Sequence, residues 1–329
     1  MRIDSSAPTR IDLAGGTLDI WPLYLLHERA QTVSAAVSLR AHCTLTSRRD
    51  YRVVITSEDT GQQVEADDPQ SLGTDRLPLA ARLVRHFGAR GLEVRTYAGA
   101  PAGAGLAASS AMSVALIGAL AAWTGRPVDD HDLLTMAVNL EAQVRQRPAG
   151  LHDVRPAFYG GVSAIEMGLA GVRRVALSVD VSELERRLVL AYLGPGQPGF
   201  DPWEVLTRRM AGDALVTETL DQLCAAALAL REALEQHAWS AAAAAMAAEW
   251  QARKRLVPTV STLEIDFLLE RARFAGALAG KACGAGGGGC IVCLIDPDRR
   301  IEVSAALTSG GGSLLPFTIE REGLTVHRR

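Results

Sequence analysis

The sequence predicts an α+β protein built from two halves. The first half holds stretches in which apolar and polar residues alternate and Val, Ile and Thr are frequent, as is typical of β-strands. An apolar helix is expected there after a glycine-rich loop. The second half is dominated by segments rich in Ala, Leu and Glu, which favour helices. The composition changes near residues 165–175, and a length of 329 residues is enough for two domains.

The first half predicts its elements in a definite order. Residues 32–57 alternate on both sides of the polar break SRRD, so we expect a β-hairpin. Residues 92–100, LEVRTYAGA, predict another strand. A helix is expected over 109–123, ended by TGRP, and a second over 128–146, whose first turn is acidic.

The second half begins with strand-like segments and then becomes helical. GVSAIEM, VRRVALSV and LVLAYLG predict three strands within residues 160–200, and residues 203–256 predict helices. Ser261 and Glu264 have the spacing of a capping box, which predicts a helix running to Gly280. The following segment KACGAGGGGCIVCLID is therefore expected to lead from that helix into a strand through a glycine tract.

Charge and composition exclude several classes of protein. The net charge is −3 and the basic residues are scattered, which argues against binding to nucleic acid or to an anionic membrane. We find no apolar run of about 18 residues and no signal-peptide pattern, so we expect a cytoplasmic protein. Cys290 and Cys293 form a C-x-x-C, but in a strand they would point to opposite faces. We therefore interpret them as buried hydrophobic residues rather than as a metal or redox pair.

Two glycine-rich loops are candidates for function. The stretch PAGAGLAASSA, residues 101–111, lies between a strand and a helix, where backbone N–H groups favour an anion. Its G-x-G-x-x-A pattern would fit a dinucleotide-binding turn, but Asp129 and Asp130, the acids at the required distance, open a helix instead of ending a strand. A Walker A loop is excluded because no Gly-Lys-Ser/Thr follows.

The second glycine-rich loop is the tract 284–289, which holds five glycines within six residues. One glycine suffices for a helix C-cap, so capping alone does not account for the tract. Consecutive glycines allow close approach of the backbone. We expect this tract to press against a ligand or against the 101–111 loop.

Together with a third stretch, APTRIDLAGGTLD, these loops resemble the motifs of the GHMP kinases. The first stretch is similar to P-x-R-[IV]-x-[LF]-x-G-G-G-T-D, the second to P-P-G-S-G-L-G-S-S-S-A and the third to G-K-x-x-G-A-G-G-G-G-F. LEAQVRQRPAGLHDVRPAFYGG and WQARKRLVPTVSTLEIDFLLERARFAGALAGK also resemble runs of the heptose 7-phosphate kinases and related sugar kinases within that superfamily. The resemblance extends from residue 8 to about residue 296.

The resemblance implies a two-domain fold and a reaction. It implies an N-terminal domain, residues 1–170, like the second domain of ribosomal protein S5, which carries the ATP phosphate loop and the metal and base residues. It implies a ferredoxin-like C-terminal domain, residues 171–329, with a glycine-rich closing loop. The implied activity is phosphoryl transfer from ATP with Mg²⁺ to a sugar or sugar phosphate, most specifically to the anomeric hydroxyl of a heptose 7-phosphate.

The resemblance also assigns roles to residues. Ser110 and Glu141 match metal-binding positions, and a solvated helix face is the alternative for Glu141. Asp153 matches the residue that accepts the proton of the attacking hydroxyl, and Arg10 matches the cation beside the transferred phosphate. The residues expected to bind the ATP phosphates are Pro101, Gly103, Ala104, Gly105, Leu106, Ala107, Ala108, Ser109 and Ser110.

The acceptor is expected to contact a second group of residues. Asp19 matches the acid that binds sugar hydroxyls, and the expected acceptor site also includes Gly16, Thr17, Asp153, Arg155, Gly286 and Gly287. Arg155 could hold an anionic group of the acceptor or could be a surface arginine. We expect His152 to be incidental, because adjacent residues in a chain point apart.

Departures from the family pattern leave the acceptor open. Leu18 stands where a threonine is usual, which predicts a partly apolar sugar pocket. Ala107 and Ala108 remove a glycine and a hydroxyl from the phosphate loop, and Val154 replaces a glutamine beside Asp153. A kinase for a different hexose, a cyclitol or a mevalonate-type acid, and a non-catalytic protein that binds sugar or nucleotide, are the alternatives. The sequence leaves the oligomeric state open, with a homodimer among the states it allows.

Overall fold

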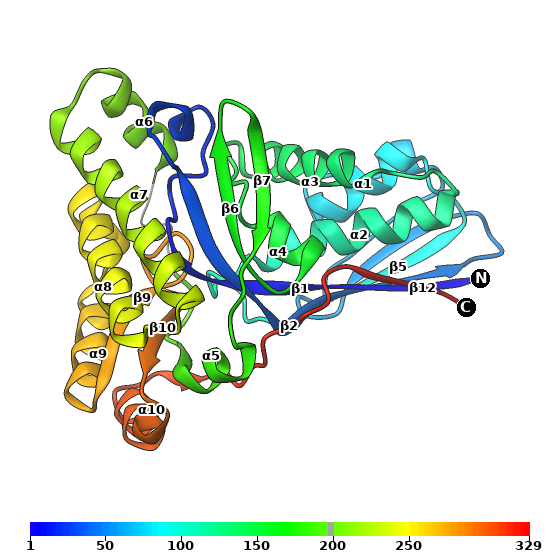
Figure 1. The fold of residues 1–329 in the computed structure, drawn as a ribbon. Coiled ribbons are helices and arrows are strands. Elements are labelled where there is room, and N and C mark those ends of the chain that lie inside the picture. Colours follow the sequence, from blue (N-terminus) through cyan, green and yellow to red (C-terminus); the bar gives the residue numbers. More distant parts are fainter. Residues whose placement is uncertain (197–200) are drawn as a thin grey trace.

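The computed structural model describes residues 1–196 and 201–329, and within them the chain forms two β-sheets (Figure 1). The first sheet has eight strands. They are β1 (Arg2–Ala14), β2 (Gln31–Ser47), β3 (Val53–Ser57), β4 (Gln63–Ala66), β5 (Leu92–Ala98), β6 (Val162–Gly168), β7 (Gly171–Ala176) and β12 (Thr325–Arg328). The second sheet has four strands in the order β11 (Ser313–Leu314), β8 (Leu188–Tyr192), β10 (Cys290–Ile295) and β9 (Ala277–Ala282).

Helices pack against both sheets. The described helices that precede β8 are α1 (Pro78–Phe87), α2 (Ala108–Thr124), α3 (Asp130–Arg145), α4 (Val154–Tyr159) and α5 (Val181–Arg187). Those that follow β8 are α6 (Pro202–Met210), α7 (Ala214–Glu235), α8 (Trp239–Leu256), α9 (Leu263–Phe274) and α10 (Arg300–Ser309). Short 3₁₀ turns occur at Leu23–Leu26, Pro69–Ser71, Pro258–Val260 and Pro297–Arg299. None of the described helices is long and apolar enough to cross a membrane.

The predicted hairpin over residues 32–57 is wrong, although both of its strands exist. β5 lies between β2 and β3: it pairs antiparallel with β2 and parallel with β3. Alternation of apolar and polar residues predicts which face of a strand is buried, but it does not predict which strand lies next to it in the sheet. The strand at 92–98 and the helices at 108–124 and 130–145 agree with the prediction.

The predicted helix up to Gly280 is also too long. α9 begins after Thr262, whose side chain accepts a hydrogen bond from the Ile265 backbone, so the N-cap is Thr262 rather than Ser261. The helix ends at Phe274, and residues 277–282 form β9, which pairs antiparallel with β10. Small residues such as those of GALAGKA carry no clear apolar period, so the pattern did not separate helix from strand here. The glycine tract is therefore the loop of a β-hairpin.

The boundary between the two sheets does not coincide with the predicted domain boundary between residues 170 and 171. β7 pairs with β6 in the first sheet, and β12 pairs with β1, so the last strand returns to the N-terminal sheet. The two ends of the chain accordingly lie side by side (Figure 1). A boundary between 170 and 171 would cut the β6–β7 hairpin.

One apolar core joins the two sheets, and a second lies behind the C-terminal sheet. Cys290, Val292 and Leu294 of β10 contribute to the first core, and Ile291, Cys293 and Ile295 contribute to the second. This is the period-two pattern of a strand that is buried on both faces. Cys290 and Cys293 thus point to opposite faces, and both are buried free thiols, as predicted.

Candidate active site

Strand β1 places two charged side chains in the interior of the protein. Arg10 and Asp12 are two residues apart, so they share one face of the strand, while Ile11 and Leu13 enter the apolar core. Arg10 donates to Asp153 Oδ1 from Nε and Nη2, at 3.0 and 2.5 Å. Its Nη1 donates to the carbonyl oxygen of Gly105 at 2.7 Å. One guanidinium therefore joins the predicted base to the predicted phosphate loop.

Asp153 belongs to a chain of three titratable side chains. His152 Nε2 lies 3.0 Å from Asp153 Oδ1, and its Nδ1 lies 2.6 Å from Asp19 Oδ2. Neither contact has the alignment of a hydrogen bond, so the attraction is mainly between charges. Gly150 makes room for the contact between Asp19 and His152, because a Cβ at Gly150 would lie 2.2 Å from Asp19 Oδ2.

The expectation that the His152 side chain points away from Asp153 is wrong. It rested on the divergence of neighbouring residues in an extended strand. His152 and Asp153 occupy the turn that leads into α4, where successive side chains diverge by only about 100° and can border the same cavity.

Burial and charge act in opposite directions on the pKa values of this site. Burial would raise the pKa of Asp153, but Arg10 and His152 hold it below its ordinary value. Burial would lower the pKa of His152, but the carboxylates of Asp19 and Asp153 raise it above its ordinary value. Arg10 lies beside Asp153 and Asp12, which raise its pKa despite burial. The site therefore holds Asp153 as a carboxylate and favours the charged form of His152.

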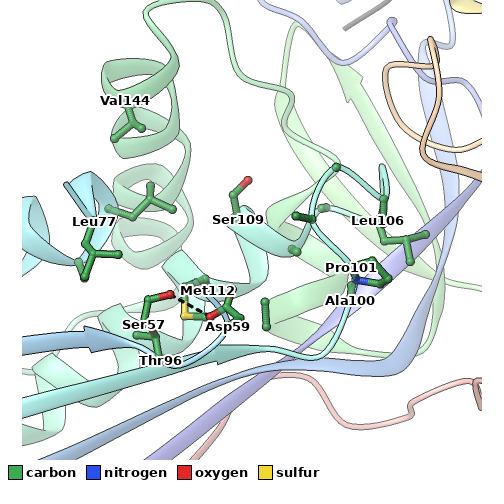
Figure 2. A pocket seen from close by; sticks show the side chains of 18 of the residues that line it. Ser57, Asp59, Leu77, Thr96, Ala100, Pro101, Leu106, Ser109, Met112 and Val144 are labelled. Carbon is green, nitrogen blue, oxygen red and sulfur yellow. Dashed lines mark hydrogen bonds between the residues drawn. The ribbon is translucent and has the colours of Figure 1, made fainter. Parts of the chain in front are cut away.

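The phosphate loop lines a cavity of about 460 Å³. The predicted phosphate-binding residues from Pro101 to Ser109 all line this cavity. Figure 2 shows the far end of the cavity, where Ser57 donates to Asp59 at 2.9 Å and Thr96, Met112 and Leu77 complete the wall. The α2 helix begins at this cavity, and its preceding residue, Ala107, has a left-handed backbone with φ of 59°. The arrangement directs the N-terminus of a buried helix towards a space that could hold an anion.

The two predicted metal-binding residues lie together. Ser110 Oγ donates to Glu141 Oε2 at 2.7 Å, and Ser109 Oγ donates to Oε1 at 2.9 Å. Glu141 is only 2% exposed, which excludes the alternative that it lies on a solvated helix face. Arg145 approaches Glu141 Oε1 at 2.7 Å and is its cationic partner. Mg²⁺ usually takes only one or two oxygen ligands from the protein and the rest from phosphates and water. A buried carboxylate beside a hydroxyl, next to the phosphate loop, fits this preference.

The second glycine tract presses on the phosphate loop, as predicted. A Cβ at Gly284 would lie 2.6 Å from the carbonyl oxygen of Gly105, and one at Gly289 would lie 2.7 Å from that of Gly103. The Cys290 backbone N–H donates to the Ala104 carbonyl at 2.9 Å. Only glycine allows this contact between two backbones.

A smaller cavity of about 250 Å³ lies between Asp153, the phosphate loop and the glycine tract. Gly16, Thr17, Asp19, Asp153 and Gly286 line it, in agreement with the expected acceptor site. Three other expectations differ from the structure, and they concern Gly287, Arg155 and Leu18.

Gly287 and Arg155 do not line this cavity. The Gly287 backbone N–H donates to Val260, and Arg155 Nη1 donates to the Leu151 carbonyl. Leu18 is fully buried among core residues, so it packs the core rather than making the cavity apolar. The two predictions about Arg155 and Leu18 assumed that each side chain faces the acceptor.

Comparison with known proteins identifies the family. Residues 76–161 match "GHMP kinases N terminal domain" and residues 230–312 match "GHMP kinases C terminal". A mevalonate kinase from Aeropyrum pernix is 32% identical over 69% of this chain and 68% of its own. The chain belongs to the GHMP kinase family.

Two further similarities cover nearly the whole GHMP kinase chain. A D-glycero-alpha-D-manno-heptose 7-phosphate kinase from Campylobacter jejuni is 29% identical over 98% of each chain. The crystal structure of a D-glycero-D-manno-heptose 1-phosphate kinase from Bacteroides thetaiotaomicron matches with a TM-score of 0.80 at 24% identity, over 99% of each chain, which shows the fold. As a GHMP kinase, the protein is an ATP-dependent phosphotransferase acting on an alcohol group.

The dinucleotide-binding alternative does not fit this GHMP kinase. Among the strand pairs of the described residues, only β3–β5 is parallel. A doubly wound dehydrogenase fold requires a mostly parallel sheet.

Sequence reasoning missed a buried ionic cluster beneath the site. Lys281 Nζ donates to Asp12 Oδ2 and to Glu249 Oε1, each at 3.0 Å, and all three residues are at most 1% exposed. The other oxygen of Asp12 accepts from the Gly284 backbone at 2.7 Å. The cluster also includes Arg253, which donates to the Gly284 carbonyl at 2.7 Å. Single charged residues inside apolar segments, such as Lys281 and Glu249, were the available signal.

Proposed function

We propose that this GHMP kinase transfers the γ-phosphoryl group of ATP, with Mg²⁺, to the anomeric hydroxyl of a sugar phosphate similar to heptose 7-phosphate. The observation that carries the proposal is the bridge made by Arg10 between Asp153 and the carbonyl of Gly105. It sets the carboxylate beside the phosphate loop, where an acceptor hydroxyl would meet the terminal phosphate. The similarity to the Campylobacter jejuni heptose 7-phosphate kinase supports a sugar phosphate as acceptor.

The residues of the site provide positioning and charge for this reaction. The acceptor hydroxyl, held by Asp19 and Asp153, would attack the γ-phosphorus of ATP while its proton moves to an oxygen of Asp153. The bond between the γ-phosphorus and the bridging oxygen of the β-phosphate would break, and ADP would leave. The fixed charge of Arg10 would stabilise negative charge that develops between acceptor and phosphate. Ser110 and Glu141 would hold Mg²⁺, which neutralises phosphate charge when bound. The glycine tract covers the phosphate loop and would limit the access of water.

The larger cavity supports ATP as the phosphoryl donor. It continues from the phosphate loop to Ser57, Asp59 and Thr96, which offer polar contacts beside the apolar side chains of Leu77 and Met112 (Figure 2). An apolar cleft with a few polar groups suits a nucleoside. We assign the base and ribose to this end and the phosphates to the loop.

The deciding experiment measures ADP formation over a panel of acceptors. The panel contains heptose 7-phosphate, its unphosphorylated sugar, galactose, an inositol and mevalonate, each with Mg²⁺ and ATP. We expect the highest kcat/KM for heptose 7-phosphate. Asp153→Asn should lower kcat by about 10²–10⁴-fold while nucleotide binding is retained.

Other results of this experiment have definite meanings. A preference for mevalonate would favour the second candidate, a mevalonate-type kinase, to which the Aeropyrum pernix relative points. Nucleotide binding without turnover of any acceptor would favour a non-catalytic binding protein. Unchanged turnover in Asp153→Asn would refute the assigned role of Asp153.

A further inference from the structure

Arg253 is a buried cation whose side chain is only partly used by the protein. It lies on α8 and is 2% exposed, yet it lines the smaller cavity together with Gly16 and Asp19. Its Nη2 donates to the Gly284 carbonyl. Its Nε and Nη1 have no hydrogen-bond acceptor among residues 1–196 and 201–329. A buried donor without a partner is costly, so its presence beside a cavity indicates a ligand.

The neighbouring carboxylate of Asp12 does not accept a hydrogen bond from these donors. Asp12 Oδ1 accepts from the Gly284 backbone and Oδ2 accepts from Lys281. Arg253 Nη1 lies 3.6 Å from Asp12 Oδ2, which is ion-pair distance but too far for a hydrogen bond. Glu249 Oε2, one turn earlier on α8, also has no donor within the described chain. The alternative to a ligand is therefore that Arg253 pairs with Glu249 and has only a structural role, and the experiment must distinguish the two.

The position of Nη1 favours the acceptor over the nucleotide. Gly16 lines the cavity, and a Cβ at Gly16 would lie 3.4 Å from Arg253 Nη1. Because Gly16 has no side chain, Nη1 lies close to the cavity wall. This wall continues to Asp19, the expected ligand of the sugar. Of the other arginines that line this cavity, Arg10 binds Asp153 and Arg145 binds Glu141, whereas Arg147 is only half-buried.

We propose that Arg253 binds a phosphate monoester that the acceptor carries before it is phosphorylated. This inference rests on the proposed function, and it names the residue that would select a phosphorylated sugar. A guanidinium is suited to this task because it stays charged when buried and directs several donors at phosphate oxygens. Arg155 is the residue that the sequence predicts for this role, but Arg155 lies outside the cavity and Arg253 lines it.

The test compares two acceptors across four proteins. The acceptors are heptose 7-phosphate and the same heptose without phosphate, and the proteins are the wild type, Arg253→Met, Arg253→Lys and Lys281→Met. Lys281→Met is the matched control, because Lys281 belongs to the same ionic cluster but does not line the cavity. The quantity measured is the ratio of kcat/KM for the phosphorylated acceptor to that for the unphosphorylated one.

We expect Arg253→Met to lower this ratio by about 10- to 100-fold, the usual range for losing hydrogen bonds to a charged group. Lys281→Met should lower both values of kcat/KM by a similar factor and leave the ratio unchanged. If Arg253→Met does not fold, Arg253→Lys becomes the test of the proposal. Lysine keeps the charge but cannot bind phosphate oxygens bidentately, so this variant should still lower the ratio by about tenfold. An equal loss for both acceptors in the Arg253 variants, or an equal fall of the ratio in Lys281→Met, would overturn the proposal.

A binding measurement separates this inference from the proposed function. If the wild type uses no sugar phosphate, the proposed function fails, and binding of orthophosphate to the enzyme saturated with Mg²⁺ and AMP-PNP then tests Arg253 directly. A dissociation constant raised about tenfold or more in Arg253→Met, but not in Lys281→Met, would sustain the anion site. Equal binding by wild type and Arg253→Met would remove it.

Discussion

Replacing His152 with glutamine should shift the acidic limb of the pH profile of kcat/KM to higher pH. Glutamine keeps a polar side chain of similar length but removes the charge that lies 3.0 Å from Asp153 and 2.6 Å from Asp19. In the proposed reaction Asp153 acts as a carboxylate, so activity should be lost as the pH falls through its pKa. Burial raises that pKa, and Arg10 and His152 together hold it below the ordinary value. The wild type should therefore stay active at pH values below the usual range of an aspartate.

The size of the shift follows from the loss of one of the two cations. An opposite charge within about 4–6 Å lowers the pKa of a carboxyl by about one to three units. Because Arg10 remains, we expect the pKa of Asp153 to rise by about one to two units. The loss of rate at neutral pH should then be modest, and the loss near pH 5 should be much larger.

The assay is kcat/KM for the acceptor between about pH 3 and pH 9, with saturating ATP and Mg²⁺. Asp19 and Asp153 raise the pKa of His152 against the effect of burial, so its charge persists above its ordinary value and is lost as the pH rises. The wild type should therefore show a modest fall in kcat/KM at alkaline pH, no larger than the loss seen in His152→Gln at neutral pH, and this fall should be absent from His152→Gln. Nucleotide binding serves as the control and should not change. Superimposable acidic limbs in the two proteins would refute an electrostatic role for His152.

Three further predictions concern the metal, the phosphate loop and the thiols. Glu141→Gln should raise the Mg²⁺ concentration for half-maximal activity by about tenfold or more, and an unchanged Mg²⁺ titration would contradict the assignment of Glu141. Ala107→Gly should raise the free energy of unfolding by about 0.5–1 kcal/mol in urea, because glycine adopts the backbone φ of 59° without strain, and a loss of stability would contradict this. Burial raises the pKa of Cys290 and Cys293 to about 12, so a disulfide reagent should modify them only after unfolding, and rapid labelling of the native protein would contradict their burial.

The sequence predicted the site better than it predicted the connections between strands. Arg10, Asp153 and the phosphate loop meet as expected, because the family motifs specify residues that must be close for phosphoryl transfer. The insertion of β5 between β2 and β3 was missed because pairing depends on contacts far apart in the chain. The start of β9 was missed because Ala and Gly residues carry little periodic signal.

The buried ionic cluster could have been predicted only in part. Lys281 and Glu249 are isolated charges in apolar segments, which suggests burial with a partner, but the sequence does not say which partner. The partners come from three separate elements, since Asp12 lies on β1, Glu249 on α8 and Lys281 on β9. Only the assembled fold shows that they fix Gly284 against the phosphate loop.

The departures from the family pattern affect the site less than their positions in the sequence suggest. Thr17 and Ala107 replace glycines, yet both keep a left-handed backbone, with φ of 87° and 59°. The surrounding structure must impose that conformation, since neither residue favours it. Val154 replaces a glutamine beside Asp153, but its side chain is fully buried in the apolar core. The polar contact with Asp153 comes instead from His152, on the opposite side in sequence, so the proposed base keeps a charged neighbour.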